Sequence, residues 1–162
     1  RGNPAAHAAR TSPWRCVMSS TLYDHDFYAW TNEQAGLLRA GKLSEADLEH
    51  IAEEIESMGK SEKRELISRL TVLLLHLLKW EFQPVRRGAS WRLSIANTRD
   101  ALTDHLADNP SLQSALEASI DTAYRRARRD AALETGFPES TFPITCPWSF
   151  NQMMDEDFWP GS

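Results

Sequence analysis

The sequence predicts an all-α protein, a compact bundle of about five helices with a C-terminal arm rich in proline and aromatic residues. Three observations predict this class. Apolar residues recur at helical spacing, glycine and proline residues mark the ends of these segments, and no segment alternates apolar and polar residues as a strand would. With 162 residues, the chain is long enough to bury a sizeable core without disulfides or metal.

Caps and helix breakers indicate where the five helices begin and end. We expect helices over residues 24–40, 44–58, 61–82, 90–108 and 110–135. The expected caps and stops, in chain order, are Asp24 or Asp26, Gly41, Ser44, Gly59, Pro84, Ser90, Asn109 with Pro110, and Gly136. The second helix is the most clearly marked, because Asp47 follows Ser44 at capping-box spacing. Its expected buried stripe consists of Leu48, Ile51, Ala52 and Ile55.

The third segment is the strongest indication of a bundle. Its apolar residues cover more than half of the helix circumference; they are Leu66, Ile67, Leu70, Leu73, Leu74, Leu77 and Leu78. Only a narrow polar stripe remains, formed by Glu65, Arg69, His76 and Lys79. A helix this apolar must be buried on several sides, so we expect it at the centre of the protein.

Composition divides the chain into three parts. Residues 1–20 carry three arginines and no acidic residue, and we interpret them as a disordered leader or upstream extension; whether residues 1–17 belong to the native protein is left open. Residues 21–136 form the predicted bundle. Residues 137–162 form the arm, expected to pack on the bundle as part of the same domain, with one short helix starting at Pro147.

Charge and cysteine content narrow the class of protein. The net charge is −5, with nine acidic and two basic residues in 24–58 but thirteen basic and nine acidic in 60–130. Net acidity disfavours nucleic-acid binding, so we expect these parts to face each other within the chain or in a homo-oligomer. No apolar run is long enough to span a membrane, and two cysteines suit a reducing compartment. We therefore expect a cytoplasmic protein.

Four residues are candidates for a polar, metal or catalytic site: His50, Glu53, Glu54 and His76. His50 and Glu54 have the i, i+4 spacing that can grip a divalent cation. However, the Glu-x-x-His pairs of di-iron bundles are missing, and a solvated acidic face is the simpler interpretation. His76 interrupts the leucine run, where we expect a hydrogen-bonded histidine packed on Trp80, with a base or ligand as the alternative. We expect no bound metal or cofactor.

Arginines form the candidate anion or nucleic-acid surface. The densest cluster is Arg125, Arg126, Arg128 and Arg129, all expected to face solvent. Arg86, Arg87, Arg92 and Arg99 would add to it. The alternative is ordinary ion pairing along the helix, because Asp121 lies one turn before Arg125.

The chain also resembles a bacterial family known as domain of unknown function family 29. The N-terminal motifs that carry the resemblance are Tyr23-Asp24-x-Asp26-Phe27-Tyr28-x-Trp30-Thr31-x-Glu33-Gln34 and Glu53-Glu54-Ile55-Glu56-Ser57-Met58-Gly59. The later motifs are His76-Leu77-Leu78-Lys79-Trp80-x-x-Gln83-Pro84 with Ser90-Trp91, Ala131-x-x-Glu134-Thr135-Gly136, Phe142-Pro143 and Cys146-Pro147-Trp148. The resemblance covers roughly Leu22 to Pro160. It implies an all-helical bacterial protein, and it implies no activity.

Three hypotheses about function follow. The first is an interaction or regulatory module without catalytic activity, which associates with itself or with another protein. The second is an enzyme or metal-binding protein that uses His76 with the carboxylates of the second helix. The third is a nucleic-acid-binding or antitoxin-like regulator that acts through the Arg125–Arg129 cluster.

Overall fold

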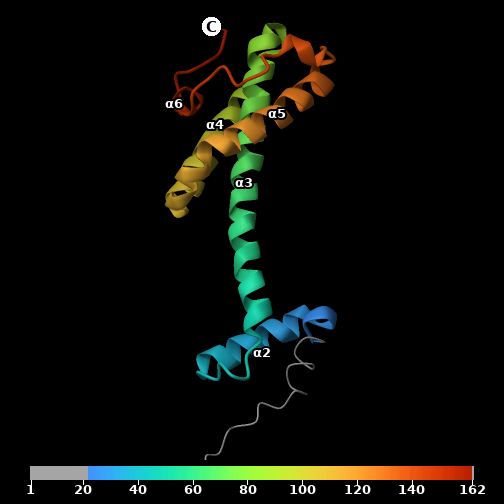
Figure 1. Ribbon diagram of the computed structural model, residues 1–162. Coiled ribbons are helices and arrows are strands. Elements are labelled where there is room, and N and C mark those ends of the chain that lie inside the picture. The colour runs from blue at the N-terminus through green and yellow to red at the C-terminus, as the bar shows by residue number, and fades with distance from the viewer. Residues whose placement is uncertain (1–21, 162) are drawn as a thin grey trace, which may run out of the picture. The chain divides into compact units, whose positions relative to one another are not determined.

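The structure, a computed structural model, describes residues 22–161, and all regular structure in them is helical (Figure 1). In chain order the elements are α2 (Phe27–Arg39), α3 (Leu48–Phe82), η1 (Pro84–Arg86), α4 (Ala89–Asp108), η2 (Pro110–Ala115), α5 (Leu116–Thr135), η3 (Glu139–Thr141) and α6 (Phe150–Met154), where η marks a 3-10 helix. The predicted all-α class is confirmed. The predicted leader, residues 1–20, lies outside the described residues. None of the described helices is long and apolar enough to cross a membrane.

The chain divides into two compact units, one ending at Met58 and the other beginning at Gly59. The first unit contains α2 and the first turns of α3. The second contains the rest of α3 and all later elements, and in it α4 and α5 lie alongside the C-terminal part of α3 (Figure 1). The domain boundaries expected from the sequence remain a prediction.

The leucine face of α3 is the core of the second unit, as predicted. Six leucines of this helix are 0% exposed: Leu66, Leu70, Leu73, Leu74, Leu77 and Leu78. They cluster with Ile95 and Leu102 of α4 and with Ala123 and Ala127 of α5. Phe142 and Met153 of the C-terminal arm join the same cluster, so the arm contributes to the core.

The predicted break at Gly59 is wrong, because α3 runs through this residue without interruption. The described glycines with positive φ are Gly41, Gly136 and Gly161, and Gly59 is not among them. A glycine inside a helix costs about 1 kcal/mol relative to alanine, which the strong helix formers on both sides can outweigh. The second and third predicted helices are therefore one helix.

The start of this helix also differs from the prediction. It begins at Leu48 rather than after Ser44, and the Asp47 carboxylate accepts a hydrogen bond from the backbone N–H of His50 at 3.4 Å. The stripe expected to be buried here is largely exposed, with Leu48 53% and Ile55 59% exposed. Helical spacing of apolar residues identifies the face that needs a partner, but it does not say that the same chain supplies one.

Several later boundaries need correction. Helix α4 begins at Ala89 with Gly88 as its N-cap, so Ser90 lies inside it. Pro110 starts a 3-10 helix rather than an α-helix, and the side chain of Asn109 donates to the His105 carbonyl instead of capping. The short helix of the arm begins at Phe150 rather than at Pro147. Its N-cap, Ser149, forms a capping box with Gln152.

Other predicted boundaries are confirmed. The Asp26 carboxylate caps α2 by accepting from the Ala29 N–H at 2.9 Å, and Gly41 with φ of 70° follows its end. Gly136, with φ of 75°, ends α5. Both glycines occupy the left-handed conformation that side chains with a Cβ rarely adopt.

We predict that Gly59→Ala raises the free energy of unfolding by about 0.5–1 kcal/mol. An added Cβ meets no heavy atom within 4 Å there, and alanine favours the continuous helix. Gly136→Ala, at positive φ, is expected to lower the free energy of unfolding by about 1 kcal/mol. Urea denaturation followed by circular dichroism measures both. A lower free energy of unfolding in Gly59→Ala would contradict a continuous α3 and would indicate a helix end at Gly59.

Candidate functional site

Two of the predicted site residues belong to a polar cluster in the first unit. The His50 Nδ1 donates to Asp47 Oδ2 at 2.7 Å, and the Tyr23 hydroxyl donates to Glu54 Oε1 at 2.5 Å. The rings of Tyr23 and His50 stack with 4.1 Å between their centroids. The backbone N–H of Asp47 is satisfied by the Gln34 side chain at 2.8 Å. The cluster therefore ties the segment before α2, α2 itself and the start of α3 together.

The ionisation of this cluster follows from its hydrogen bonds. The bond to Asp47 raises the pKa of His50 above its ordinary value. Burial acts to raise the pKa of Asp47, but its hydrogen bonds with His50 outweigh burial and lower it. The hydrogen bond to Glu54 raises the pKa of Tyr23 to about 12. The hydrogen bonds thus favour the charged form of His50, the charged form of Asp47 and the neutral form of Tyr23.

The other two predicted site residues, Glu53 and His76, form no hydrogen bond with this cluster in the described residues. Glu53 is exposed, while His76 belongs to the second unit, where its Nδ1 donates to the Val72 carbonyl at 2.8 Å. Within residues 22–161, no group of three or more His, Cys, Asp or Glu side chains is placed to hold a metal ion. What the structure brings together is His50 with Asp47, and Glu54 with Tyr23.

Arginines near the C-terminus hold the arm in place. The Arg87 side chain donates to the carbonyls of Trp80 at 2.7 Å and Gly161 at 3.2 Å, whereas Arg86 is exposed. Arg99, expected on an anion-binding surface, is only 5% exposed. It donates to the carbonyls of Met153 at 2.7 Å and Phe158 at 2.9 Å. Arg87 and Arg99 thus bind backbone carbonyls of the arm, and the sequence carried no signal for this role.

The four arginines of α5 differ in their surroundings. Arg128 is not solvent-facing as expected, because it pairs with Glu139 at 3.0 Å and donates to the Phe142 carbonyl at 3.2 Å. Arg129 pairs with Asp130. Arg125 and Arg126 have no ion-pair partner among the described residues. Together with Arg129 and Thr122, they line a shallow notch of about 280 Å³.

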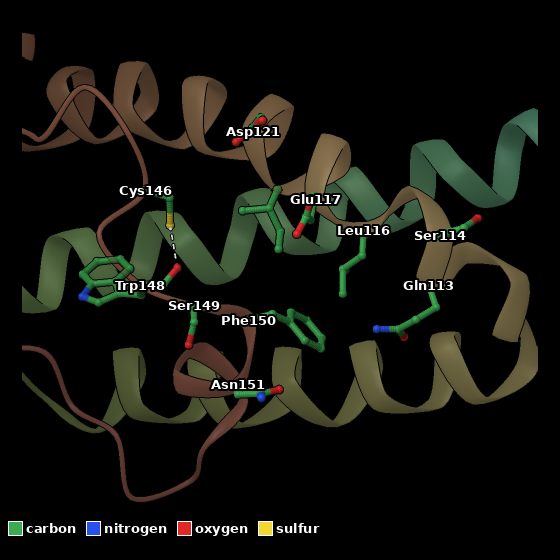
Figure 2. Close-up of a pocket in the computed structure, with 11 residues that line it drawn as sticks. Gln113, Ser114, Leu116, Glu117, Asp121, Cys146, Trp148, Ser149, Phe150 and Asn151 are labelled. Carbon is green, nitrogen blue, oxygen red and sulfur yellow. Dashed lines mark hydrogen bonds between the residues drawn. The ribbon is translucent and has the colours of Figure 1, made fainter.

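A groove that no sequence motif predicts lies between the N-terminal part of α5 and the arm (Figure 2). Its volume is about 630 Å³. The residues that line it are Gln113, Ser114, Leu116, Glu117, Ile120, Asp121, Cys146, Trp148, Ser149, Phe150 and Asn151. Its two sides come from segments about thirty residues apart in sequence, which explains why no local motif marks it.

The groove is acidic and contains a protonated thiol. Burial raises the pKa of Cys146, and its thiol donates to the Trp148 carbonyl at 3.4 Å, drawn as a dashed line in Figure 2. A thiol in this state is a poor nucleophile at neutral pH. None of the lining residues is basic. The ion pair expected between Asp121 and Arg125 is not formed in the described part of the chain.

We predict that the imidazole of His50 titrates above about 6.5, the value of an unperturbed histidine. The contribution of His50 is fully present below the pKa of an unfolded histidine and is lost as pH rises through its raised folded pKa. The contribution of Asp47 is lost at the acid end, as pH falls through its lowered folded pKa. An NMR titration measures the pKa of His50 directly. Asp47→Asn should lower it clearly, and Glu49→Gln, which removes a weaker influence, should change it much less. An unchanged pKa in Asp47→Asn would contradict the hydrogen-bonded pair.

Comparison with known proteins confirms the resemblance seen in the sequence. No curated protein and no solved structure matches the chain. A family described as "Domain of unknown function DUF29" matches residues 22–159, which include the polar cluster, both sets of arginines and the groove. The chain therefore belongs to the DUF29 family.

Proposed function

We propose that this protein is an interaction module without catalytic activity that associates with a second copy of itself. The observation that supports this is the apolar stripe at the start of α3. Leu48, Ile55 and Met58 lie on one side of the helix at helical spacing, and they are 53%, 59% and 61% exposed. Exposed apolar stripes of this kind are characteristic of surfaces that another protein covers.

A second copy is a suitable occupant of this stripe. Two amphipathic helices can bury their apolar stripes against each other across a two-fold axis, and each copy then contributes the same residues. Burying these exposed side chains favours association. The loss of translational and rotational freedom opposes it, so the dimer is expected to be weak.

The charge of the first unit determines how this dimer responds to salt. Residues 24–58 contain nine acidic and two basic side chains, so two first units repel each other. Added salt screens this repulsion, while apolar burial does not weaken. The dimer should therefore become tighter as the salt concentration rises, the opposite of a contact held by attraction between unlike charges.

We predict a monomer–dimer equilibrium at tens of micromolar protein that shifts toward dimer when NaCl is raised from about 50 to about 500 mM. Sedimentation velocity at several protein concentrations measures the Kd. Ile55→Glu should abolish the dimer, because it places two carboxylates in the apolar contact.

The matched control is Leu133→Glu, since Leu133 is an exposed apolar residue of α5, 77% exposed, outside the stripe. This variant should dimerise like the parent protein. A protein that remains monomeric at every salt concentration, or an Ile55→Glu variant that dimerises normally, would contradict self-association through the stripe.

Anion binding is a second candidate function, supported by the notch on α5. Arg125 and Arg126 are exposed, without ion-pair partners in the described residues, and share the notch with Arg129. Guanidinium groups gathered in this way suit phosphate oxygens. With only three arginines and a net charge of −5, the binding of a nucleic acid should be weak.

We predict that a labelled single-stranded oligonucleotide binds at low salt, with log Kd rising by no more than about 2 for each tenfold increase in salt. Fluorescence anisotropy measures this slope. The double variant Arg125→Gln/Arg126→Gln should lose binding, while Lys63→Gln, an exposed cation of α3, should retain it. Binding that is absent at low salt, or equal in both variants, would contradict a role for the notch.

A further inference from the structure

We propose that the groove between α5 and the C-terminal arm binds a lysine or arginine side chain presented by a segment of a partner protein. This site lies wholly in the second unit and is separate from the self-association stripe. The proposal therefore does not depend on dimerisation. Three features of the groove support the proposal: its carboxylates, its aromatic and apolar side chains, and its volume.

The two carboxylates of the groove have no basic side chain as an ion-pair partner among the described residues. Glu117 and Asp121 lie one turn apart on α5 and form no ion pair with any described residue, although Arg125 lies only one further turn along. Figure 2 shows the Glu117 side chain pointing from α5 toward the groove, with Asp121 further along the same helix. Both side chains are exposed, and two unpaired carboxylates one turn apart attract a positively charged ligand through their combined charge.

Aromatic and apolar side chains complete the environment that a cationic side chain needs. Trp148 and Phe150 line the arm side of the groove, and Leu116 and Ile120 line the α5 side. In Figure 2, Leu116 and Phe150 point toward the space between the two segments. Lysine and arginine bury their methylene stems on such surfaces, and their charged heads interact with the faces of aromatic rings.

The size of the groove indicates a segment of polypeptide rather than an isolated ion. A volume of about 630 Å³ is in the range of sites that hold ligands of many atoms. The amide side chains of Gln113 and Asn151 and the Ser149 hydroxyl line the same groove. Amides both donate and accept hydrogen bonds, so they suit the backbone of a bound peptide.

The test uses a short fluorescein-labelled peptide with one central arginine among glycine and serine residues. Its matched probe contains citrulline instead, which has nearly the same shape but no charge. We expect the arginine peptide to bind at least about tenfold more tightly than the citrulline peptide in fluorescence anisotropy, since hydrogen bonds to charged groups are the stronger ones. Its binding should weaken with added salt.

Variants locate the binding on the protein. Glu117→Gln/Asp121→Asn should abolish the preference for arginine, whereas Asp104→Asn, an exposed carboxylate of α4 outside the groove, should retain it. Ile55→Glu should also retain it, so failure of this proposal and failure of self-association give different results. Circular dichroism confirms that each variant is folded.

The rate of Cys146 alkylation gives a second measurement of binding, and it requires no substitution in the groove. In a Cys16→Ser background, the arginine peptide should slow alkylation of Cys146 by a maleimide, because Cys146 lines the groove. Equal affinity for the two peptides, no binding at millimolar peptide, or an alkylation rate that the peptide leaves unchanged would overturn the proposal. Free arginine amide binding as tightly as the peptide would show a site for a small organic cation, and would equally overturn a protein partner.

Discussion

Burial of the leucine face of α3 is the constraint on which the second unit depends. Six leucines with no exposed surface require neighbours on several sides, and α4, α5 and the arm supply them. Replacing one such leucine by alanine costs about 2–5 kcal/mol in other proteins, a large fraction of the stability of a domain. The positions of α4, α5 and the arm, and therefore of the groove, follow from this central helix.

The C-terminal arm is held by a different interaction, hydrogen bonds from side chains to its backbone carbonyls. Its prolines prevent long helices or a strand ladder, so the arm cannot satisfy these carbonyls within itself. Arg99 donates to Met153 and Phe158, and the Tyr124 hydroxyl donates to Pro143 at 2.8 Å. These bonds place Trp148 and Phe150 against the core. Arg99, which was expected to attract an external anion, thus helps to hold the arm that forms one side of an acidic groove.

The sequence predicted what depends on local pattern and missed what depends on distant contacts. The leucine run, the cap at Asp26 and the stop at Gly136 follow from spacing and backbone preference, and the structure confirms them. Gly59 was misread because a glycine signals a helix end only when the backbone adopts positive φ, which its neighbours do not impose. The groove could not be predicted, since its carboxylates and its aromatic rings meet only when the arm folds back on α5.

The first unit shows why an apolar stripe can remain exposed in a stable chain. It has fewer than about 40 described residues, a size at which a hydrophobic core alone rarely suffices. In α2 only Trp30 and Gln34 are buried. Hydrogen bonds of Asp47, His50 and Tyr23 and ring contacts of Tyr23 with Trp30 and His50 connect the parts of the unit. An apolar stripe that is not needed inside this unit is free to contact another molecule. The proposed self-association would cover this stripe and so add apolar burial that the small first unit does not obtain internally.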